Sequence, residues 1–167
     1  MPPEASPALL QIYRDFLIPG RGAEYRALEE EAARICAELA FPHAHLAIES
    51  LTGPKEVWWL NAFGSEAERR RVTEDYAKKP ALVAALAGIT SRREGLVGSV
   101  FEAPDGTRFV FWPAGTREES DAMAAAAGPD TRVFAVRPNW GMPAPEWIAA
   151  APEFWKDNPA ARARRER

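Results

Sequence analysis

The segment EVWWLNAF, residues 56–63, decides which fold this sequence can adopt. Its length and its aromatic and β-branched side chains are typical of a β-strand. Because successive side chains of a strand point to opposite faces, Trp59 and Asn61 share one face, and Trp58 and Leu60 share the other. Large apolar side chains therefore stand on both faces. We expect both sides of this strand to be covered.

The sequence before this segment predicts a strand, a helix and a second strand. Residues 9–18, LLQIYRDFLI, are rich in apolar residues and end at the turn sequence PGRG. Over residues 23–39 apolar residues recur at steps of three or four, which predicts an amphipathic helix that Pro42 ends. Residues 45–51, HLAIESL, predict a strand. The short turn TGPK then joins it to residues 56–63 as a hairpin.

A further helical region follows this hairpin. Ser65 and Glu68 have the spacing of a capping box, which predicts that a helix begins there. Pro80 falls within the same region, so the helix either kinks at the proline or ends and starts again as ALVAALAGI. The pattern alone leaves both alternatives open.

The remainder of the chain predicts another hairpin and a broken tail. Residues 95–114 read as two strands around the turn sequence PDG. Residues 117–127 read as a short helix and residues 131–138 as a last strand. After them, prolines interrupt a tail that is partly helical in pattern.

The order of the first six elements, βαββαβ, is that of a ferredoxin-like α+β fold. We therefore expect an antiparallel sheet with helices on one face, followed by an extra C-terminal hairpin, strand and helix. Residues 1–8 are predicted to be a disordered N-terminus. Residues 9–138 are predicted to form the domain, and residues 139–167 a C-terminal extension.

In such a two-layer domain the sheet face away from the helices would expose a large apolar patch. The strand at residues 56–63 contributes to that patch whichever way it faces. A second copy of the same sheet is the simplest cover, because identical surfaces meet in symmetric dimers. The sequence therefore predicts a homodimer.

The element order, together with IYRDFLIPGRGAEYRALEEE at residues 12–31, resembles the dimeric α+β-barrel superfamily. The closest resemblance is to NIPSNAP-like proteins and antibiotic-biosynthesis-monooxygenase-like domains, and it covers roughly residues 9–113. In those proteins two sheets face each other as a barrel, and each subunit can hold a pocket between sheet and helices. The resemblance implies a homodimer with a cofactor-independent monooxygenase-like activity. Haem-degrading members bind iron through a helix histidine, which this chain lacks, so no cofactor is expected.

Composition restricts the possible partners. The net charge of −3 over 167 residues predicts no general attraction to nucleic acid or to an anionic membrane surface. No apolar run is long enough to span a bilayer, and no signal-peptide pattern is present, so a cytoplasmic protein is expected. The single cysteine, Cys36, excludes an internal disulfide. Its position on the flank of the apolar stripe predicts a buried structural thiol.

The segment FPHAHLAIES, residues 41–50, contains both histidines of the chain. On a strand, His43, His45 and Glu49 share one face, which would suit a metal. At ~3.3 Å per residue, however, Glu49 lies ~13 Å from His45, so no metal site is predicted. Two readings remain open. Either both histidines are partly exposed at the start of a strand, or one lines a pocket as an acid–base group.

A set of aromatic and polar residues could converge across the sheet as a pocket for a small aromatic or apolar ligand. Among them Tyr13, Asn61 and His45 are the candidate catalytic residues. The alternative is that the aromatic residues form only the core and a dimer interface, in a non-catalytic protein that acts in assembly or protein binding. The predicted ligand-binding residues are Tyr13, Arg14, His43, His45, Trp59, Asn61 and Trp112.

Overall fold

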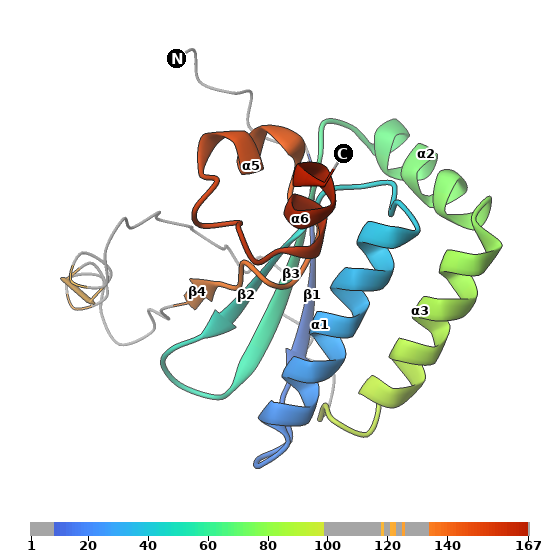
Figure 1. Ribbon diagram of the computed structural model, residues 1–167. Coiled ribbons are helices and arrows are strands. Elements are labelled where there is room, and N and C mark those ends of the chain that lie inside the picture. The colour runs from blue at the N-terminus through green and yellow to red at the C-terminus, as the bar shows by residue number, and fades with distance from the viewer. Residues whose placement is uncertain (1–8, 99–117, 119–120, 123–124, 126–133, 167) are drawn as a thin grey trace.

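A computed structural model describes residues 9–98, 118, 121–122, 125 and 134–166 of this chain (Figure 1). These residues form an α+β structure with a four-stranded antiparallel sheet, as the sequence predicts. The predicted disordered segment 1–8, the hairpin at 95–114 beyond residue 98, and Trp112 lie outside the described residues. So does most of the helix predicted at 117–127.

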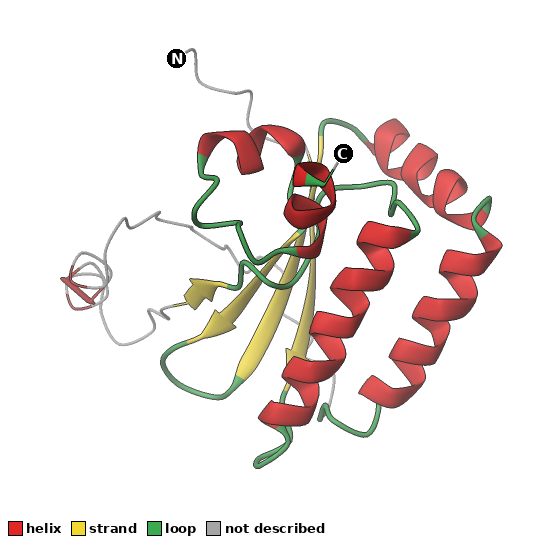
Figure 2. Cartoon of the chain, viewed as in Figure 1, coloured by secondary structure: helices red, strands yellow, loops and turns green. Residues whose placement is uncertain are grey.

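The sheet has the strand order β1-β3-β2-β4, with every neighbouring pair antiparallel (Figure 2). The strands are β1 (Leu9–Phe16), β2 (Leu46–Ser50), β3 (Glu56–Phe63) and β4 (Phe134–Val136). The segment EVWWLNAF is thus a central strand, paired on both edges. In this register Tyr13 lies opposite Trp59, and Trp59 lies opposite Ala47.

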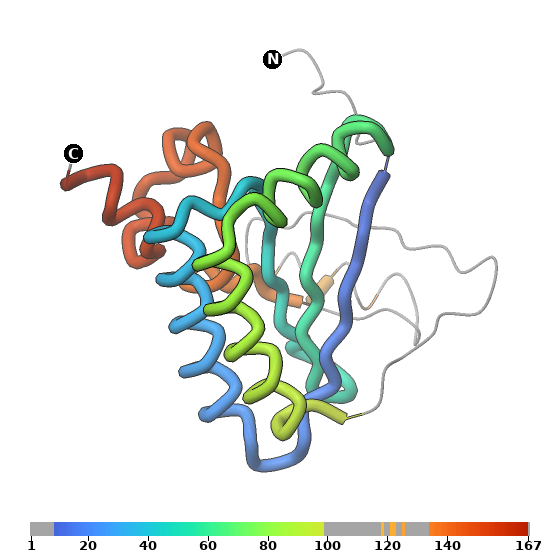
Figure 3. Tube along the Cα trace, turned by 90° about the vertical axis from the view of Figure 1, so that its right-hand side faces the viewer, coloured from blue at the N-terminus to red at the C-terminus, as the bar shows by residue number. Residues whose placement is uncertain are grey.

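The helices α1 (Gly22–Glu38), α2 (Glu66–Ala77) and α3 (Pro80–Arg93) lie on one side of the sheet (Figure 3). Helix α1 turns its predicted apolar stripe toward the sheet, and Tyr25, Leu28 and Ala32 are buried there. Beyond the end of α1, the N–H of Phe41 donates to the carbonyl of Cys36 at 2.8 Å. The helix therefore ends just before Pro42, close to the predicted position.

The predicted start of α2 is confirmed. The Ser65 hydroxyl accepts a hydrogen bond from the Glu68 N–H at 3.1 Å, and the Glu68 carboxylate accepts one from the Gly64 N–H at 2.6 Å. Of the two alternatives at Pro80, the chain takes the second, because α2 ends at Ala77 and α3 begins at Pro80. Proline suits the first turn of a helix, where its missing N–H is not needed.

The C-terminal residues pack on the domain rather than apart from it. They contain α5 (Pro145–Ala150) and α6 (Pro159–Arg165), and α6 lies against α1. The fully buried Asn158 ties this segment to the chain just after β4, because its amide donates to the Pro138 carbonyl at 2.7 Å. The side-chain oxygen of Asn158 accepts from the Ala160 N–H at 2.9 Å and caps α6.

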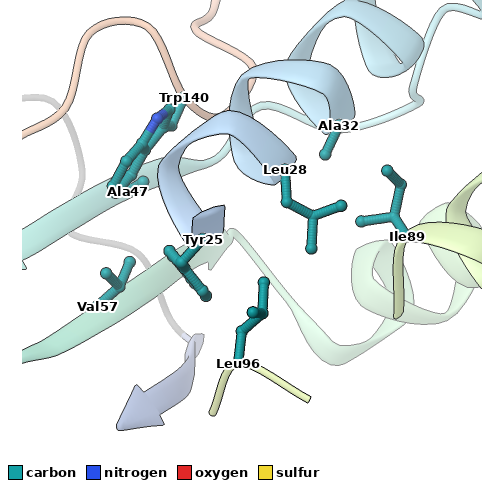
Figure 4. Packing of buried hydrophobic residues seen from close by; sticks show 8 residues of the cluster. All are labelled: Tyr25, Leu28, Ala32, Ala47, Val57, Ile89, Leu96 and Trp140. Atoms are coloured by element: carbon teal, nitrogen blue, oxygen red, sulfur yellow. The ribbon is translucent and has the colours of Figure 1, made fainter. Parts of the chain in front are cut away.

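The hydrophobic core lies between α1, α3 and the helix-facing side of the sheet (Figure 4). Trp140, only 2 % exposed, belongs to this core and packs edge to face with Tyr25 at 6.0 Å between ring centroids. The segment predicted as an extension thus supplies a core residue. Among the described helices, none is long and apolar enough to cross a membrane. The core cluster consists of Tyr25, Leu28, Ala32, Ala47, Val57, Ile89, Leu96 and Trp140.

Candidate ligand-binding cavity

A cavity of about 430 Å³ lies between the sheet and the three helices that cover it. Its volume falls within the range of small-molecule sites, which is roughly 300–1,000 Å³. Aromatic side chains form much of its wall. Strands, helices and the loop before β2 contribute Gln11, Tyr13, Glu29, Ala32, Ala33, Cys36, Phe41, His43, His45, Trp59, Asn61, Phe63, Arg69, Val72, Thr73, Tyr76, Leu86, Ile89, Thr90, Arg93 and Gly141.

Strand alternation places the sheet residues of this wall. Gln11 pairs with Asn61 and Tyr13 with Trp59, so these four side chains point to the same face of β1 and β3. That face is the one the helices cover. Tyr13 is 54 % exposed and therefore lies at the rim of the cavity rather than inside it.

Trp59 is held in place by hydrogen bonds at its indole nitrogen. Nε1 lies 3.4 Å from Oδ2 of Asp15 and 3.3 Å from the Tyr25 hydroxyl. The Tyr25 hydroxyl itself donates to the same Asp15 oxygen at 2.6 Å. Burial raises the pKa of Tyr25, and the nearby Glu29 and Asp15 act in the same direction, so its hydroxyl stays protonated. The aromatic wall is thus anchored by a buried polar cluster.

A buried ion pair closes one side of the cavity. Nε and Nη2 of Arg93 donate to the two carboxylate oxygens of Glu29 at 2.7 and 2.9 Å. Arg93 also lies 3.8 Å from Asp15 and 5.9 Å from the ring centroid of Trp59. Burial raises the pKa of Glu29, and the Arg93 guanidinium opposes that shift. Breaking such a pair would leave a buried charge without its partner, which is costly.

Both histidines lie on the cavity wall, and each is half-buried. The His43 ring stacks on Phe63 with 4.3 Å between centroids, and the His45 ring contacts Phe41 at 5.2 Å and Trp59 at 5.9 Å. Burial lowers the pKa of His43. Burial also lowers the pKa of His45 to about 4. Both imidazoles are therefore neutral at neutral pH.

The backbone around His45 is fixed by the C-terminal segment. His45 and Met142 form a two-way β-bridge, with the His45 N–H donating to Met142 at 2.9 Å and the Met142 N–H donating back at 3.1 Å. Gly141, beside this bridge, has a φ of +73° and lines the cavity. Residues 140–142 therefore set the position of His45, although they lie far from it in the sequence.

Comparisons with protein-family models, with curated proteins and with solved structures find no match to this chain.

The structure brings together most of the residues that the sequence singled out. Tyr13, His43, His45, Trp59 and Asn61 all line the cavity. Trp112 lies outside the described residues.

Arg14 does not line the cavity, which corrects the predicted set. It follows Tyr13 on the same strand, so alternation turns its side chain to the opposite face of the sheet. There its Nε and Nη2 donate to Oε2 of Glu56 at 3.1 and 2.7 Å. Trp58, also on that face, donates its indole N–H to the same oxygen at 2.9 Å.

Sequence reasoning missed the charged pair of the cavity. Glu29 reads as one of several acidic residues on the polar side of a helix, and Arg93 follows another arginine at the end of α3. Only the helical spacing could have indicated that Glu29 is buried. It lies four residues after Tyr25 and directly after Leu28, and so borders the apolar stripe. Helix α2 also contributes cavity residues, and among them Arg69 pairs with Glu66 at 2.6 Å.

Cys36 is buried, as predicted. It borders the cavity, and burial raises the pKa of its thiol to about 12, which keeps it protonated and a poor nucleophile. The carboxylate considered with the histidines, Glu49, instead pairs with Arg137 at 3.3 Å. Within the described part of the chain, no group of three or more histidine, cysteine or acidic residues is placed to hold a metal.

Proposed function

We propose that this protein binds a small, uncharged, largely aromatic molecule in the cavity between its sheet and helices. The observation that carries the proposal is a cavity of about 430 Å³ with aromatic walls whose charged groups already have partners. Planar ligands pack well on rings such as those of Trp59, Phe41 and Tyr76.

The charged groups around the cavity favour an uncharged ligand. Arg93 is shared between Glu29 and Asp15, so two carboxylates face one guanidinium. An anionic ligand would meet a formally negative cluster in a poorly solvated site, where like charges repel strongly. Arg69, the second cation among the described residues of the wall, is bound to Glu66. A cationic ligand would have to compete with Arg93 for both of its carboxylates.

Titration with prodan, an uncharged naphthalene fluorophore whose emission shifts to the blue in an apolar site, tests this proposal. We expect saturable binding of one prodan per chain. The variant Ala33→Phe fills the cavity from α1 and should abolish the shift. Ala87→Phe makes the same change at an exposed position of α3 away from the cavity lining, and should leave it intact.

Two results would argue against the proposal. One is the absence of saturable binding to a folded wild-type protein. The other is equal binding by the two alanine variants, which would place the probe elsewhere. Circular dichroism of both variants separates a filled cavity from a loss of folding.

A cofactor-independent monooxygenase-like activity stays a second proposal, based on the family resemblance. Such chemistry needs a base that removes a proton from the substrate. His45 is the predicted candidate for this base, but burial lowers its pKa to about 4 and makes it a weak base at neutral pH. The cavity therefore favours binding over this reaction. Oxygen uptake with any ligand that displaces prodan would test turnover.

The ferredoxin-like order and the dimeric barrel also stay proposals. In that fold the fourth strand lies beside the first, whereas β4 lies beside β2. Val97, after α3, forms an antiparallel bridge with Leu17 at the end of β1, on the edge where a ferredoxin-like strand would run.

On the face away from the helices Leu10 and Val136 are 39 % and 38 % exposed, which leaves apolar surface for a second copy. The non-catalytic assembly role would be favoured by a dimer that binds no small molecule.

A further inference from the structure

Among the described residues, one ring nitrogen of His45 has a hydrogen-bond partner and the other has none. Nδ1 lies 3.4 Å from the carbonyl oxygen of His43, an acceptor that can pair only with a protonated nitrogen. The proton of the neutral ring therefore sits on Nδ1, and Nε2 carries a lone pair. Among the described residues, Nε2 makes no hydrogen bond. His45 thus offers the cavity a hydrogen-bond acceptor without a partner.

Of the other polar groups near the cavity, Nε2 of His43 is also buried without a hydrogen-bond partner, whereas the carboxylates are already engaged. Both carboxylate oxygens of Glu29 bind Arg93, and Oδ2 of Asp15 accepts from Tyr25 and Trp59. The side-chain amides of Gln11 and Asn61 can turn either an oxygen or a nitrogen to a ligand, so they discriminate poorly between donor and acceptor groups. Nε2 of neutral His45, in contrast, can only accept.

The location of His45 places this acceptor beside the aromatic wall. Its ring centroid lies 5.9 Å from that of Trp59, and the guanidinium carbon of Arg93 lies at the same distance from the Trp59 ring. A planar ligand packed on Trp59 would therefore have His45 within reach of its edge. The Met142 bridge holds the His45 backbone, so the acceptor is fixed before a ligand arrives. Fixed polar groups lose little entropy on binding.

We propose that His45 determines the specificity of the cavity by accepting, through Nε2, a hydrogen bond from a hydroxyl or N–H group of an uncharged aromatic ligand. This inference rests on the proposed ligand-binding function and adds the class of polar group that the ligand must carry. A ligand that carries only an ether or carbonyl oxygen would form no hydrogen bond with Nε2 and would separate it from water. An acceptor that loses water without gaining a partner weakens binding.

Competition against prodan with naphthol, methoxynaphthalene and methylnaphthalene tests the proposal on the wild-type protein. Naphthol has a donor, methoxynaphthalene only an acceptor, and methylnaphthalene neither. We expect naphthol to bind on the order of tenfold more tightly than either of the others, which corresponds to one good hydrogen bond. Binding of naphthol should also shift the ¹⁵N resonance of His45 Nε2, which a purely structural histidine would not show.

The variant His45→Phe keeps an aromatic ring and removes the acceptor. It should bring the affinities for naphthol and methoxynaphthalene together while methylnaphthalene still binds. If the ligands bind the wild-type protein equally, or if His45→Phe keeps the preference for naphthol, the role of His45 is refuted while the cavity remains a binding site. If none of the ligands nor prodan binds the folded protein, the proposed function itself fails. The wild-type comparison decides the matter even if the variant does not fold.

Discussion

Gly141 lies against the backbone of His45, so closely that a Cβ atom on Gly141 would come within 2.7 Å of the His45 carbonyl oxygen. Its φ of +73° is in the left-handed region, which glycine adopts readily and residues with a Cβ atom rarely adopt. The contact lets the chain after β4 bridge to His45 and place Trp140 in the core. One glycine thus connects the C-terminal segment with the cavity wall.

Replacement of this glycine should be costly. We expect Gly141→Ala to lower the free energy of unfolding by at least about 2 kcal/mol. The strain of alanine at a positive φ and the clash of its Cβ with the His45 backbone both destabilise the fold. Gly88→Ala is the matched control, since Gly88 lies within α3 and a Cβ there meets nothing within 4 Å. It should be neutral or stabilise by up to about 1 kcal/mol, because alanine favours a helix. Urea unfolding measures the stability of both variants. Equal losses would contradict the close approach of Gly141 to the His45 backbone.

Stability should fall as the pH drops below neutrality. The pKa of His45 is lowered to about 4 in the folded protein and is ordinary in the unfolded chain. The unfolded state therefore takes up a proton first, so folding stability is lost as the pH falls from about 6.5 to about 4, by up to about 3 kcal/mol. His43, whose pKa is also lowered by burial, contributes in the same direction.

The variant His45→Phe isolates this effect from the carboxylates, which titrate in an overlapping range. Urea unfolding at pH 7 and at pH 4.5 should show a smaller loss of stability in the variant than in the wild-type protein, by on the order of 2 kcal/mol. An identical pH dependence would mean that His45 is solvated or charged in the folded state.

The hydroxyl of Tyr25 should stabilise the fold. Tyr25→Phe removes the donor to Asp15 and leaves that partly buried carboxylate with fewer partners. We expect a loss of about 1–3 kcal/mol in the free energy of unfolding. Tyr13→Phe makes the same chemical change at a hydroxyl on a half-exposed side chain and should change stability by less than about 0.5 kcal/mol. Similar losses in both variants would refute the role of the Asp15 cluster.

Cys36 should be unreactive in the folded protein. Burial raises the pKa of its thiol to about 12, so the thiolate is scarce at neutral pH. A colorimetric disulfide reagent should label one thiol per chain rapidly in denaturant and at least about 100-fold more slowly under native conditions. Rapid stoichiometric labelling of the native protein would show that α1 and the cavity are open to solvent.

The proposed homodimer has a direct measurement. Sedimentation equilibrium at micromolar concentration should give twice the chain mass of 18.4 kDa. Leu10→Lys, on the face away from the helices, should weaken the dimer, because a buried lysine at such an interface lacks a partner. A mass near that of one chain in the wild-type protein would exclude the dimeric barrel.

The sequence by itself determined which side chains share a face. Strand period two put Trp59 with Asn61 on one face. Helical spacing placed Tyr25, Leu28, Ala32, Ile35 and Leu39 on one apolar stripe, of which the first three are buried. Local signals also worked at Ser65 and Glu68, whose capping hydrogen bond needs only neighbours in the chain. Such patterns depend on backbone geometry within one element, so they can be derived without knowledge of the rest.

Only the tertiary structure decided which face the helices cover and what meets across the cavity. Periodicity distinguishes two faces of a strand without saying which one is packed, so the cavity side of β3 could not be chosen beforehand. Glu29 and Arg93 are 64 residues apart, and their pairing follows from the packing of α1 on α3. The depressed pKa of His45 depends on tertiary packing too, because its ring lies against Trp59 of another strand as well as against the nearby Phe41, and this burial removes its water.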